Sequence, residues 1–373
     1  MLTTFLKDIP DFRRRQGQMY ELEHILCFSI LAILCGAKSY RNIGSFIEIH
    51  FKSLKEHFFL RWKKPPGYTT IRNIIKGVDS SAMEAAFRKF SLHLSTLSEQ
   101  PGARLIAMDG KVIRKSFDNF NDKKAAQILS FFDAQEHFIL GHVLINDKSN
   151  EIPSAQALLK SLTIENAVYT LDALHLTTGT FEAAALNNQG VLIQLKENQK
   201  NLLEDVECLT NNNTPAQTHE PPAECGHGRI EKRTTKVYSD VNIIKNEILN
   251  EDWETKIITI AKVERKTERF DAVSKTYIPS EETAYFLANV ALTAEQAHKS
   301  IRFHWGIENR NHYVRDVALQ EDNSRIRINP FNIAVLRSFA LNIFRANNIE
   351  NISQELYCNS LNWQRIYSYP QAV

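Results

Sequence analysis

The feature that most constrains the fold is a change of apolar periodicity near residue 100. Before it, apolar residues recur every three or four positions, as in LEHILCFSILAILCGAKSYRNIGSFIEIHF and AMEAAFRKFSLHL, which is typical of helices. After it, beginning with RLIAMD, the apolar runs are short and are bounded by polar residues or glycines. The sequence therefore predicts an all-helical N-terminal domain over residues 1–95 and a domain containing a sheet over residues 96–373.

The order of the later segments predicts an α/β fold. Three strand-like runs come first (RLIAMD, AAQILSFFDA and FILGHVLIN), and helices then alternate with the strands AVYTLD and GVLIQLK. We expect a mixed sheet flanked by helices, in which the first and fourth strands can lie side by side. Strand-like runs between residues 197 and 293 indicate a β-rich insertion. Two helices, over residues 294–314 and 330–346, close the chain.

Charge is distributed unevenly along the chain. The net charge is only +2, but residues 1–100 hold 15 Lys or Arg against 9 Asp or Glu, so the rest of the chain is net acidic. A basic N-terminal part predicts a polyanionic partner. Within it, Arg13, Arg14 and Arg15 predict an exposed cluster that contacts phosphates. Residues 68–76 resemble the Thr-capped second helix of a helix-turn-helix, with Arg72 and Lys76 facing DNA; a plain structural helix is the alternative.

Cysteine usage and hydropathy bear on the compartment. The five cysteines are odd in number and lack paired C-x-x-C spacing, so the sequence suggests neither a disulfide framework nor a zinc ribbon. The most apolar run, residues 25–37, is too short to span a bilayer. A reducing cytoplasm and no membrane association are therefore expected.

Three acidic residues are the candidates for chemistry. Asp109 and Asp172 follow buried strands, where a carboxylate is costly unless it binds something, and Glu308 lies in a helical run. Three convergent carboxylates can hold two Mg²⁺ ions about 4 Å apart, because Mg²⁺ prefers oxygen ligands. Each residue also has an ordinary interpretation: a hairpin turn at Asp109–Gly110, a helix N-cap at Asp172 and a solvated helix position at Glu308.

The helix around Glu308 allows two further interpretations. His304, Glu308 and His312 recur at i, i+4 and i+8, so a zinc site is an alternative, although the spacing H-E-x-x-H is absent. Trp305 and Tyr313 could stack on nucleic-acid bases, but we expect them to pack the helix onto the sheet.

Several ordered motifs carry a resemblance to a known family. IAMDGK, LDALH, LKENQ, GHGRIE, HWGIENRNH and DVALQEDNSRIR are similar to motifs of DDE insertion-sequence transposases of the H-repeat-associated type. The segment IPDFRRRQGQMYELEHILCFSILAILCGAKSYRNI resembles the associated N-terminal domain of that family. The resemblance covers nearly the whole chain and implies a ribonuclease H-like sheet domain. Lys115 and Glu197 depart from the pattern, which has small glycines there.

The resemblance also implies an activity and its residues. Asp109, Asp172 and Glu308 become a catalytic triad that binds two Mg²⁺ ions, for which Mn²⁺ can substitute. The residues expected to meet DNA phosphates or to steady the acids are Lys111, Lys196, His304, Arg310 and His312.

The implied reaction is Mg²⁺-dependent hydrolysis of a phosphodiester at each element end, followed by attack of the freed 3′ hydroxyl on target DNA. The implied partners are terminal inverted repeats, target DNA and a second copy of the chain, in the cytoplasm at the nucleoid. A catalytically inactive or domesticated sequence-specific DNA-binding protein is the alternative.

Overall fold

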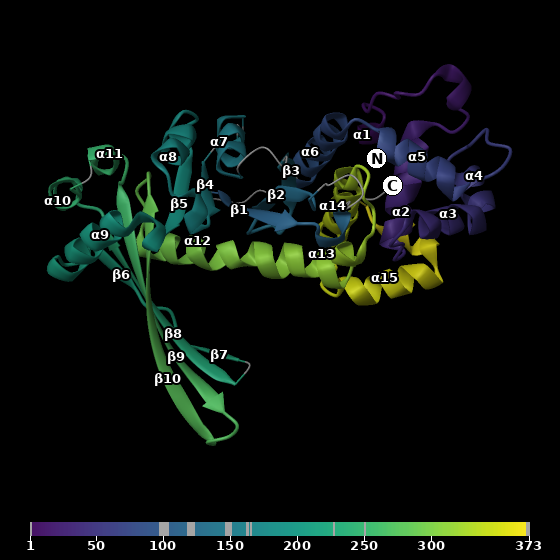
Figure 1. Ribbon diagram of the computed structural model, residues 1–373. Coiled ribbons are helices and arrows are strands. Elements are labelled where there is room, and N and C mark those ends of the chain that lie inside the picture. Colours follow the sequence, from purple (N-terminus) through teal and green to yellow (C-terminus); the bar gives the residue numbers. More distant parts are fainter. Residues whose placement is uncertain are drawn as a thin grey trace. The chain divides into compact units, whose positions relative to one another are not determined.

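The computed structural model describes residues 2–96, 104–117, 124–145, 151–161, 164, 166–226, 228–249 and 251–370 (Figure 1). The chain forms two compact units. Unit 1 comprises residues 1–100, 110–149 and 307–373, and unit 2 comprises residues 101–109 and 150–306. Strand β1 (Arg104–Val112) passes from unit 2 into unit 1 after Asp109. None of the described helices is both long and apolar enough to cross a bilayer.

Unit 1 is built around two helices that are apolar on nearly every side. These are α2 (Leu22–Leu34) and α14 (Pro330–Ala346), which pack against each other and whose side chains are almost all buried. A helix that is apolar all round must lie inside a protein core. The other helices of the unit are α1 (Leu2–Leu6), α3 (Tyr40–Ile49), α4 (Phe51–His57), α5 (Tyr68–Gly77), α6 (Ser80–Thr96), α13 (Tyr313–Val317) and α15 (Ile352–Leu361).

The strands of unit 1 lie in the order β3-β2-β1. β2 (Gln127–Asp133) and β3 (Ile139–Ile145) pair antiparallel, as predicted. The predicted hairpin turn at Asp109–Gly110 is wrong, because β1 continues through both residues to Val112. Asp109 is therefore held by extended strand backbone rather than by a turn.

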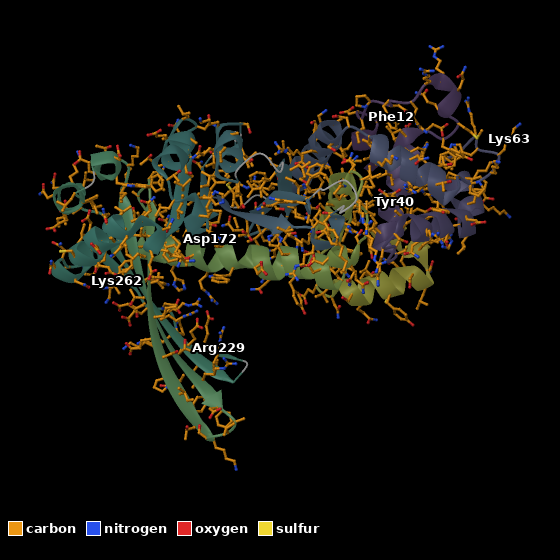
Figure 2. All side chains as sticks on the ribbon, viewed as in Figure 1. Phe12, Tyr40, Lys63, Asp172, Arg229 and Lys262 are labelled. Carbon is orange, nitrogen blue, oxygen red and sulfur yellow. The ribbon has the colours of Figure 1, made fainter. Side chains whose placement is uncertain are left out.

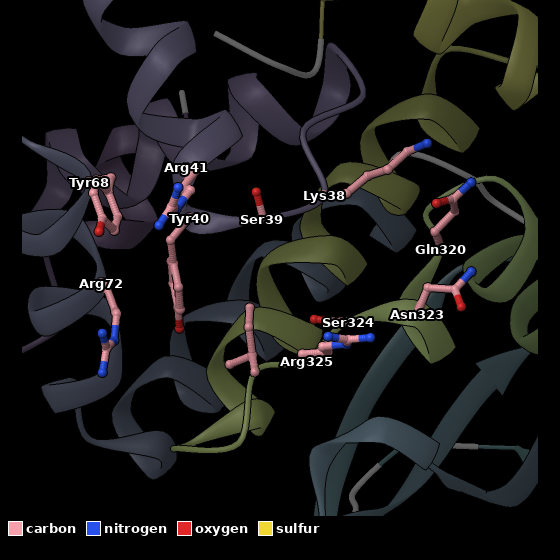
Figure 3. A pocket seen from close by; sticks show the side chains of 11 residues that line it. Lys38, Ser39, Tyr40, Arg41, Tyr68, Arg72, Gln320, Asn323, Ser324 and Arg325 are labelled. Atoms are coloured by element: carbon pink, nitrogen blue, oxygen red, sulfur yellow. The ribbon is translucent and has the colours of Figure 1, made fainter.

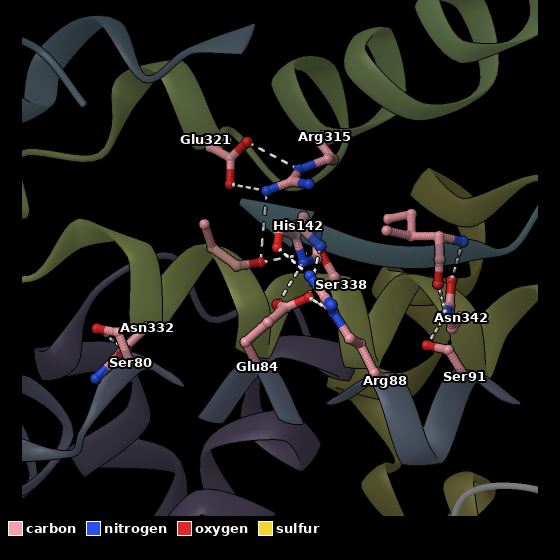
Figure 4. A network of polar contacts seen from close by, with 12 residues as sticks. Ser80, Glu84, Arg88, Ser91, His142, Arg315, Glu321, Asn332, Ser338 and Asn342 are labelled. Atoms are coloured by element: carbon pink, nitrogen blue, oxygen red, sulfur yellow. Dashed lines mark hydrogen bonds and ion pairs between the residues drawn. The ribbon is translucent and has the colours of Figure 1, made fainter. Parts of the chain in front are cut away.

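A buried polar network joins the helical and strand parts of unit 1 (Figure 4). His142 of β3 lies 3.0 Å through Nδ1 from Glu84 Oε2 of α6 and 3.0 Å through Nε2 from Ser338 Oγ of α14. The order Ser, His, Glu is that of a hydrolytic triad, but all three side chains are buried. We therefore assign them a structural role, since buried polar groups need such partners.

Unit 2 contains a mixed sheet in the order β1-β4-β5-β10-β9-β8-β6, with β7 paired to β8. β1, β4 and β5 are parallel neighbours, and the strands from β5 to β8 pair antiparallel. With β2 and β3, ten strands are found among the described residues, and this confirms the predicted mixed sheet. The strands are β4 (Ala167–Leu171), β5 (Gly190–Leu195), β6 (Gln217–His219), β7 (Glu224–Gly226), β8 (Arg229–Tyr238), β9 (Thr259–Asp271) and β10 (Thr276–Ala288).

Helices cover both faces of the unit 2 sheet (Figure 1). α7 (Glu151–Ser161) and α8 (Thr178–Ala185) lie on one face, and α12 (Ala294–Gly306) lies on the other. Leu105 of β1 and Val168 of β4 pack against Ile301 of α12. Every second residue of these strands therefore faces α12.

The region from 197 to 293 extends this sheet instead of forming a separate one, because β10 pairs with β5. It also contains three helices that the sequence analysis did not anticipate: α9 (Lys200–Asn212), α10 (Val241–Glu247) and α11 (Glu251–Glu254). The distal halves of β8, β9 and β10 project from unit 2 as a ribbon, on which Figure 2 labels Arg229.

Candidate active site

Two of the predicted acidic residues lie side by side in unit 2. The parallel pairing of β1 with β4 runs to Ala107↔Thr170, and the same register continued by two residues places Asp109 level with Asp172. Because alternate side chains of a strand point to the same face, both carboxylates lie on the face that α12 covers. Two acids predicted from distant motifs therefore share one edge and one face of the sheet.

A histidine from α12 lies close to both carboxylates. His304 Nδ1 is 3.0 Å from Thr170 Oγ1, so the ring is fixed over the end of β4. Burial lowers the pKa of His304, and this effect outweighs the negative charges of Asp109 and Asp172, which raise it. The imidazole is therefore neutral near pH 7, which makes it a hydrogen-bonding group rather than a competing cation.

Asp172 is poised to stay ionised. Its Oδ1 accepts a hydrogen bond of 2.7 Å from Ala173 N and lies 3.5 Å from Lys196 Nζ. Burial tends to raise the pKa of Asp172, but the hydrogen bond from Ala173 N–H and the positive charge of Lys196 prevail and lower it. The N-cap interpretation is also correct, because Asp172 caps the short 3₁₀ turn Ala173–His175. This role leaves the side chain largely exposed, with lone pairs for another ligand.

The loop after β5 is attached to the loop after β4 by two amide side chains. Asn198 Nδ2 donates to Ala173 O at 2.9 Å, and Gln199 Nε2 donates to Leu176 O at 3.2 Å. These bonds hold the backbone that carries Lys196 beside Asp172. The sequence analysis noted LKENQ as a motif but assigned no role to its amides; their position directly after a strand was the available signal.

Glu308 lies in unit 1, in the π-helical turn Ile307–His312 that follows α12. Its side chain is exposed, and one of its carboxylate oxygens lies within 4.8 Å of a ring nitrogen of His312. A π turn carries about one more residue per turn than an α-helix, is rare, and is frequently found at functional sites. The chain thus places an irregular helical turn at the third predicted acid.

Of three predicted neighbours, Lys111 differs from the expectation, whereas Lys196 and His304 lie near the predicted acids. Lys111 Nζ contacts Asp316, and it lies 4.0 Å from carboxylate oxygens of both Glu321 and Asp322. A lysine surrounded by three acids is already neutralised within unit 1. Lys196 remains half exposed beside Asp172, and His304 lies near both aspartates, as described above.

Arg310 and His312 belong to the π turn. The Arg310 guanidinium contacts His137 Nε2, and its backbone carbonyl accepts a hydrogen bond from Arg345. Burial and the two guanidinium groups lower the pKa of His137 to about 4. His312 is buried. Arg310 therefore braces the turn within unit 1.

Two expectations about the N-terminal basic residues need correction. Arg13 is not an exposed residue: its guanidinium is paired with Asp11 at 2.6 Å and donates to Tyr20 O at 2.8 Å, whereas Arg14 and Arg15 are exposed. The helix carrying Arg72 and Lys76 forms as predicted, but it has no threonine cap, because its N-cap is Gly67 without a side-chain hydrogen bond.

The two aromatic residues flanking Glu308 do not pack onto the sheet, so that expectation is wrong. Trp305 and Tyr313 are each 61% exposed. The apolar contacts of α12 are made by Ile301 and Phe303 instead. Both exposed rings remain accessible to a partner.

Comparison with known families gives two adjoining matches. Residues 3–91 match a family described as DDE_Tnp_1-associated, and residues 100–343 match the family described as Transposase DDE domain. The second match contains Asp109, Asp172 and Glu308 and covers more than half of the chain.

Several proteins of Escherichia coli are similar over most of their length. "H repeat-associated putative transposase YhhI" from strain K12 is 27% identical over 322 residues, which is 86% of this chain and 83% of that protein. "Putative transposase YncI" from strain O157:H7 is 27% identical over 366 residues, which is 92% of this chain and 87% of that protein. Among solved structures, a piggyBac transposase synaptic complex with hairpin DNA aligns with a TM-score of 0.40 and 12% identity, covering 99% of this chain and 79% of that chain. This last likeness is too distant to add to the assignment.

Proposed function

This chain belongs to the Transposase DDE domain family, and on that premise we propose that it cuts phosphodiester bonds at the ends of a mobile DNA element and joins the freed 3′ hydroxyls to target DNA. The observation that best supports the proposal is the strand register that brings Asp109 beside Asp172, with His304 of α12 near enough for both carboxylates to affect its pKa. In phosphoryl transfer a protein contributes mainly positioning and electrostatic stabilisation, and little covalent chemistry. A cluster of ionised oxygens at a rigid strand edge supplies both.

Asp109, Asp172 and Glu308 would hold two Mg²⁺ ions, with Mn²⁺ as a substitute. The donor set fits, because carboxylate oxygens are the ligands of hard cations and Asp172 has a lowered pKa that keeps it ionised. When bound, such ions offset the negative charge that builds up on the phosphate oxygens during displacement. The neutral state of His304 suits the same site, because it adds no repulsion to a cation.

Residues around the carboxylates would position them and the DNA. Thr170 fixes the His304 ring beside both acids, and Asn198 holds the loop of Lys196. Lys196 carries its positive charge 3.5 Å from Asp172, where it can also meet a phosphate oxygen of the bound strand. We assign Arg13, Lys111 and Arg310 to support of the surrounding structure, because each is engaged by other side chains of the protein.

The inclusion of Glu308 rests on chain continuity. Asp109 is the last residue of unit 2 before β1 enters unit 1, and Glu308 is the second residue of unit 1 after α12. It also follows His304 by only four residues, across the junction of α12 with the π turn. A carboxylate that close along the chain to His304 is a suitable third ligand.

The proposed partners follow from the reaction. Terminal inverted repeats and target DNA would be bound through cations that include Arg14, Arg15, Arg72 and Lys76, which lie on the surface or at its margin. Two element ends require two sites, so we propose a homodimer on DNA, acting in the cytoplasm at the nucleoid.

The deciding experiment measures nicking of a DNA fragment that carries the flanking terminal repeats, with Mg²⁺ and with EDTA. Asp172→Asn removes one ligand charge but keeps the side-chain shape, so we expect at least about a hundredfold slower nicking with unchanged DNA affinity. Glu207→Gln, an exposed carboxylate of α9, is the matched control and should nick like the wild type. Equal nicking by Asp172→Asn would remove this residue from the site.

The second candidate, a DNA-binding protein without catalysis, predicts a different result. In that case the wild type would bind the terminal repeats specifically yet leave them intact with either Mg²⁺ or Mn²⁺.

A further inference from the structure

Unit 1 contains a groove whose lining includes none of the three predicted acids. Two cavities of about 420 and 370 Å³ adjoin, because both are lined by Tyr40, Arg72, Arg325 and Ile326. One wall is formed by the starts of α3 and α5, and the other by the extended segment 323–328 (Figure 3). Figure 3 shows Tyr40 standing between Arg72 and Arg325.

The groove has an unusual charge. Its lining includes no carboxylate and six cations: Lys38, Arg41, Arg72, Lys76, Arg325 and Arg327. None of the six forms an ion pair within the part of the chain that the structure describes. Arg41 and Arg327 lie instead over the rings of Tyr68 and Phe117, at 5.0 and 6.0 Å from the centroids. Uncompensated cations gathered in one concave place attract an anion that presents several charges.

Two helix N-termini add to the positive potential. Tyr40 is the first residue of α3 and Tyr68 the first of α5, and both line the groove. The first backbone N–H groups of a helix have no partner within it and favour anions. Ser39 caps α3, whereas Gly67 leaves the start of α5 without a side-chain cap. The N-terminus of α5 can therefore donate to a ligand.

Two hydroxyl groups supply an independent sign of a ligand. Tyr40 Oη and Ser324 Oγ are both buried, and among the described residues neither has a hydrogen-bond partner. Burial raises the pKa of Tyr40 to about 12, so its hydroxyl keeps its proton at any physiological pH. Buried polar groups in native proteins nearly always have a partner. An anionic oxygen in the groove would satisfy both donors.

The second wall is anchored before any ligand arrives. Glu321, two residues before Asn323, is fully buried between Arg315 at 2.8 Å and Arg337 at 3.6 Å. Arg325 and Arg327 extend from this anchored turn. Preorganised cations lose little freedom on binding, which increases affinity.

We infer that this groove binds the sugar-phosphate backbone of duplex DNA, with the N-terminal region supplying one wall and residues 323–328 the other. The identity of the polymer rests on the proposed function, but the binding itself needs neither metal nor catalysis. Six cations spread over two adjoining cavities exceed what one free phosphate requires and suit consecutive phosphates along a strand. Lys38, Arg41, Tyr40, Ser324, Arg325 and Arg327 thereby gain a role as DNA contacts.

The test is fluorescence anisotropy of a labelled duplex carrying a terminal repeat, in EDTA and at several KCl concentrations. Arg325→Gln should weaken binding and lower the slope of log K against log salt by about one, because one phosphate contact is lost. Lys52→Gln, an exposed cation of α4 outside the groove, is the matched control and should change neither quantity. Wild-type affinity and slope in Arg325→Gln would overturn the inference.

Tyr40→Phe separates a ligand contact from a folding effect. The hydroxyl is neutral, so its removal should weaken DNA binding by about tenfold with an unchanged salt slope. Because the hydroxyl has no partner in the free protein, thermal stability should not fall. Unchanged affinity in this variant would refute the assignment of Tyr40. Tighter binding of a duplex RNA of equal length than of the DNA would overturn DNA as the occupant.

The outcomes for groove and catalysis are distinguishable. Lost binding in the groove variants, combined with a wild type that never nicks, supports the groove and refutes the enzyme. Intact binding in those variants, combined with Mg²⁺-dependent nicking that Asp172→Asn abolishes, supports the enzyme and refutes the groove.

Discussion

At the residue scale, the least expected feature is a buried ion cluster in unit 1. Glu321 is fully buried, and Figure 4 shows its carboxylate paired with the buried Arg315. The buried Arg337 shares the same carboxylate. Burial alone would raise the pKa of Glu321, but the two guanidinium groups outweigh it and lower the pKa to about 2. The motif DVALQEDNSRIR contains Glu321 and directly follows Arg315, but nothing in its local pattern indicates that this acid is internal. Its partner Arg337 comes from the next helix.

We predict that Glu321→Gln lowers the free energy of unfolding by about 3–5 kcal/mol, because two buried guanidinium groups lose their counter-charge. Urea unfolding at pH 7 measures the loss, and Glu350→Gln, at an exposed position, should be nearly neutral. The folded pKa of Glu321 lies below the unfolded value, so its stabilisation is present above about pH 4.5 and disappears as the pH falls toward 2. A Glu321→Gln chain as stable as the wild type at pH 7 would contradict this account.

At the element scale, the crossing of α3 and α5 depends on one small residue. A Cβ added at Gly44 would meet Tyr68 Cβ at 3.0 Å and Tyr68 Cα at 3.3 Å, whereas at Gly17 the nearest atom is 3.7 Å away. Since the backbone of α5 must give way, the two helices can approach this closely only with glycine at position 44. The same contact sets the width of the groove wall.

Gly44→Ala should therefore destabilise the protein by about 1–2 kcal/mol despite the better helix propensity of alanine. It should also weaken binding of DNA, because the start of α5 moves away from Tyr40. Chemical denaturation and anisotropy measure the two effects, with Gly17→Ala as the comparison. Improved stability with unchanged binding would show that α5 tolerates the extra methyl group in place.

Elements with a clear apolar pattern were predictable, and those without one were not. The helix over residues 330–346 was predicted with the bounds of α14, and the side-by-side placement of β1 and β4 followed from the strand order. The distal ends of β9 and β10 could not be predicted, because strand residues exposed on both faces show no alternation of apolar and polar side chains. The helix α9 was not predicted for a similar reason, because most of its residues are polar.

In the candidate site, too, some features were predictable from the sequence and others were not. Asp109 and Asp172 could be predicted as neighbours because each ends an apolar run, and the two runs pair within one sheet. The π turn around Glu308 could not, since one inserted residue leaves no apolar signature. Lys111 looked like a free cation because its acidic partner, Asp316, is distant in the sequence. Local sequence patterns carry no information about contacts between segments that are far apart in the sequence.

At the scale of the whole molecule, one chain supplies one set of candidate ligands, while the proposed reaction joins two element ends. In the proposed mechanism each end needs an intact Asp109, Asp172 and Glu308, so concerted joining would require two competent chains in one assembly. Closed symmetric dimers are the commonest way to present two identical sites. This requirement can be tested without knowing the arrangement of the dimer.

We predict that an equimolar mixture of wild type and Asp172→Asn retains about one quarter of the concerted joining activity, because random pairing leaves that fraction of dimers with two intact sites. A chain acting alone would retain about one half. Total protein is held constant and saturating over a fragment with two terminal repeats, and joined products are counted by gel electrophoresis. Mixing with Glu207→Gln should leave activity unchanged, which controls for dilution. Retention of about one half, with that control unaffected, would show that each chain completes the reaction independently and that a dimer is not required.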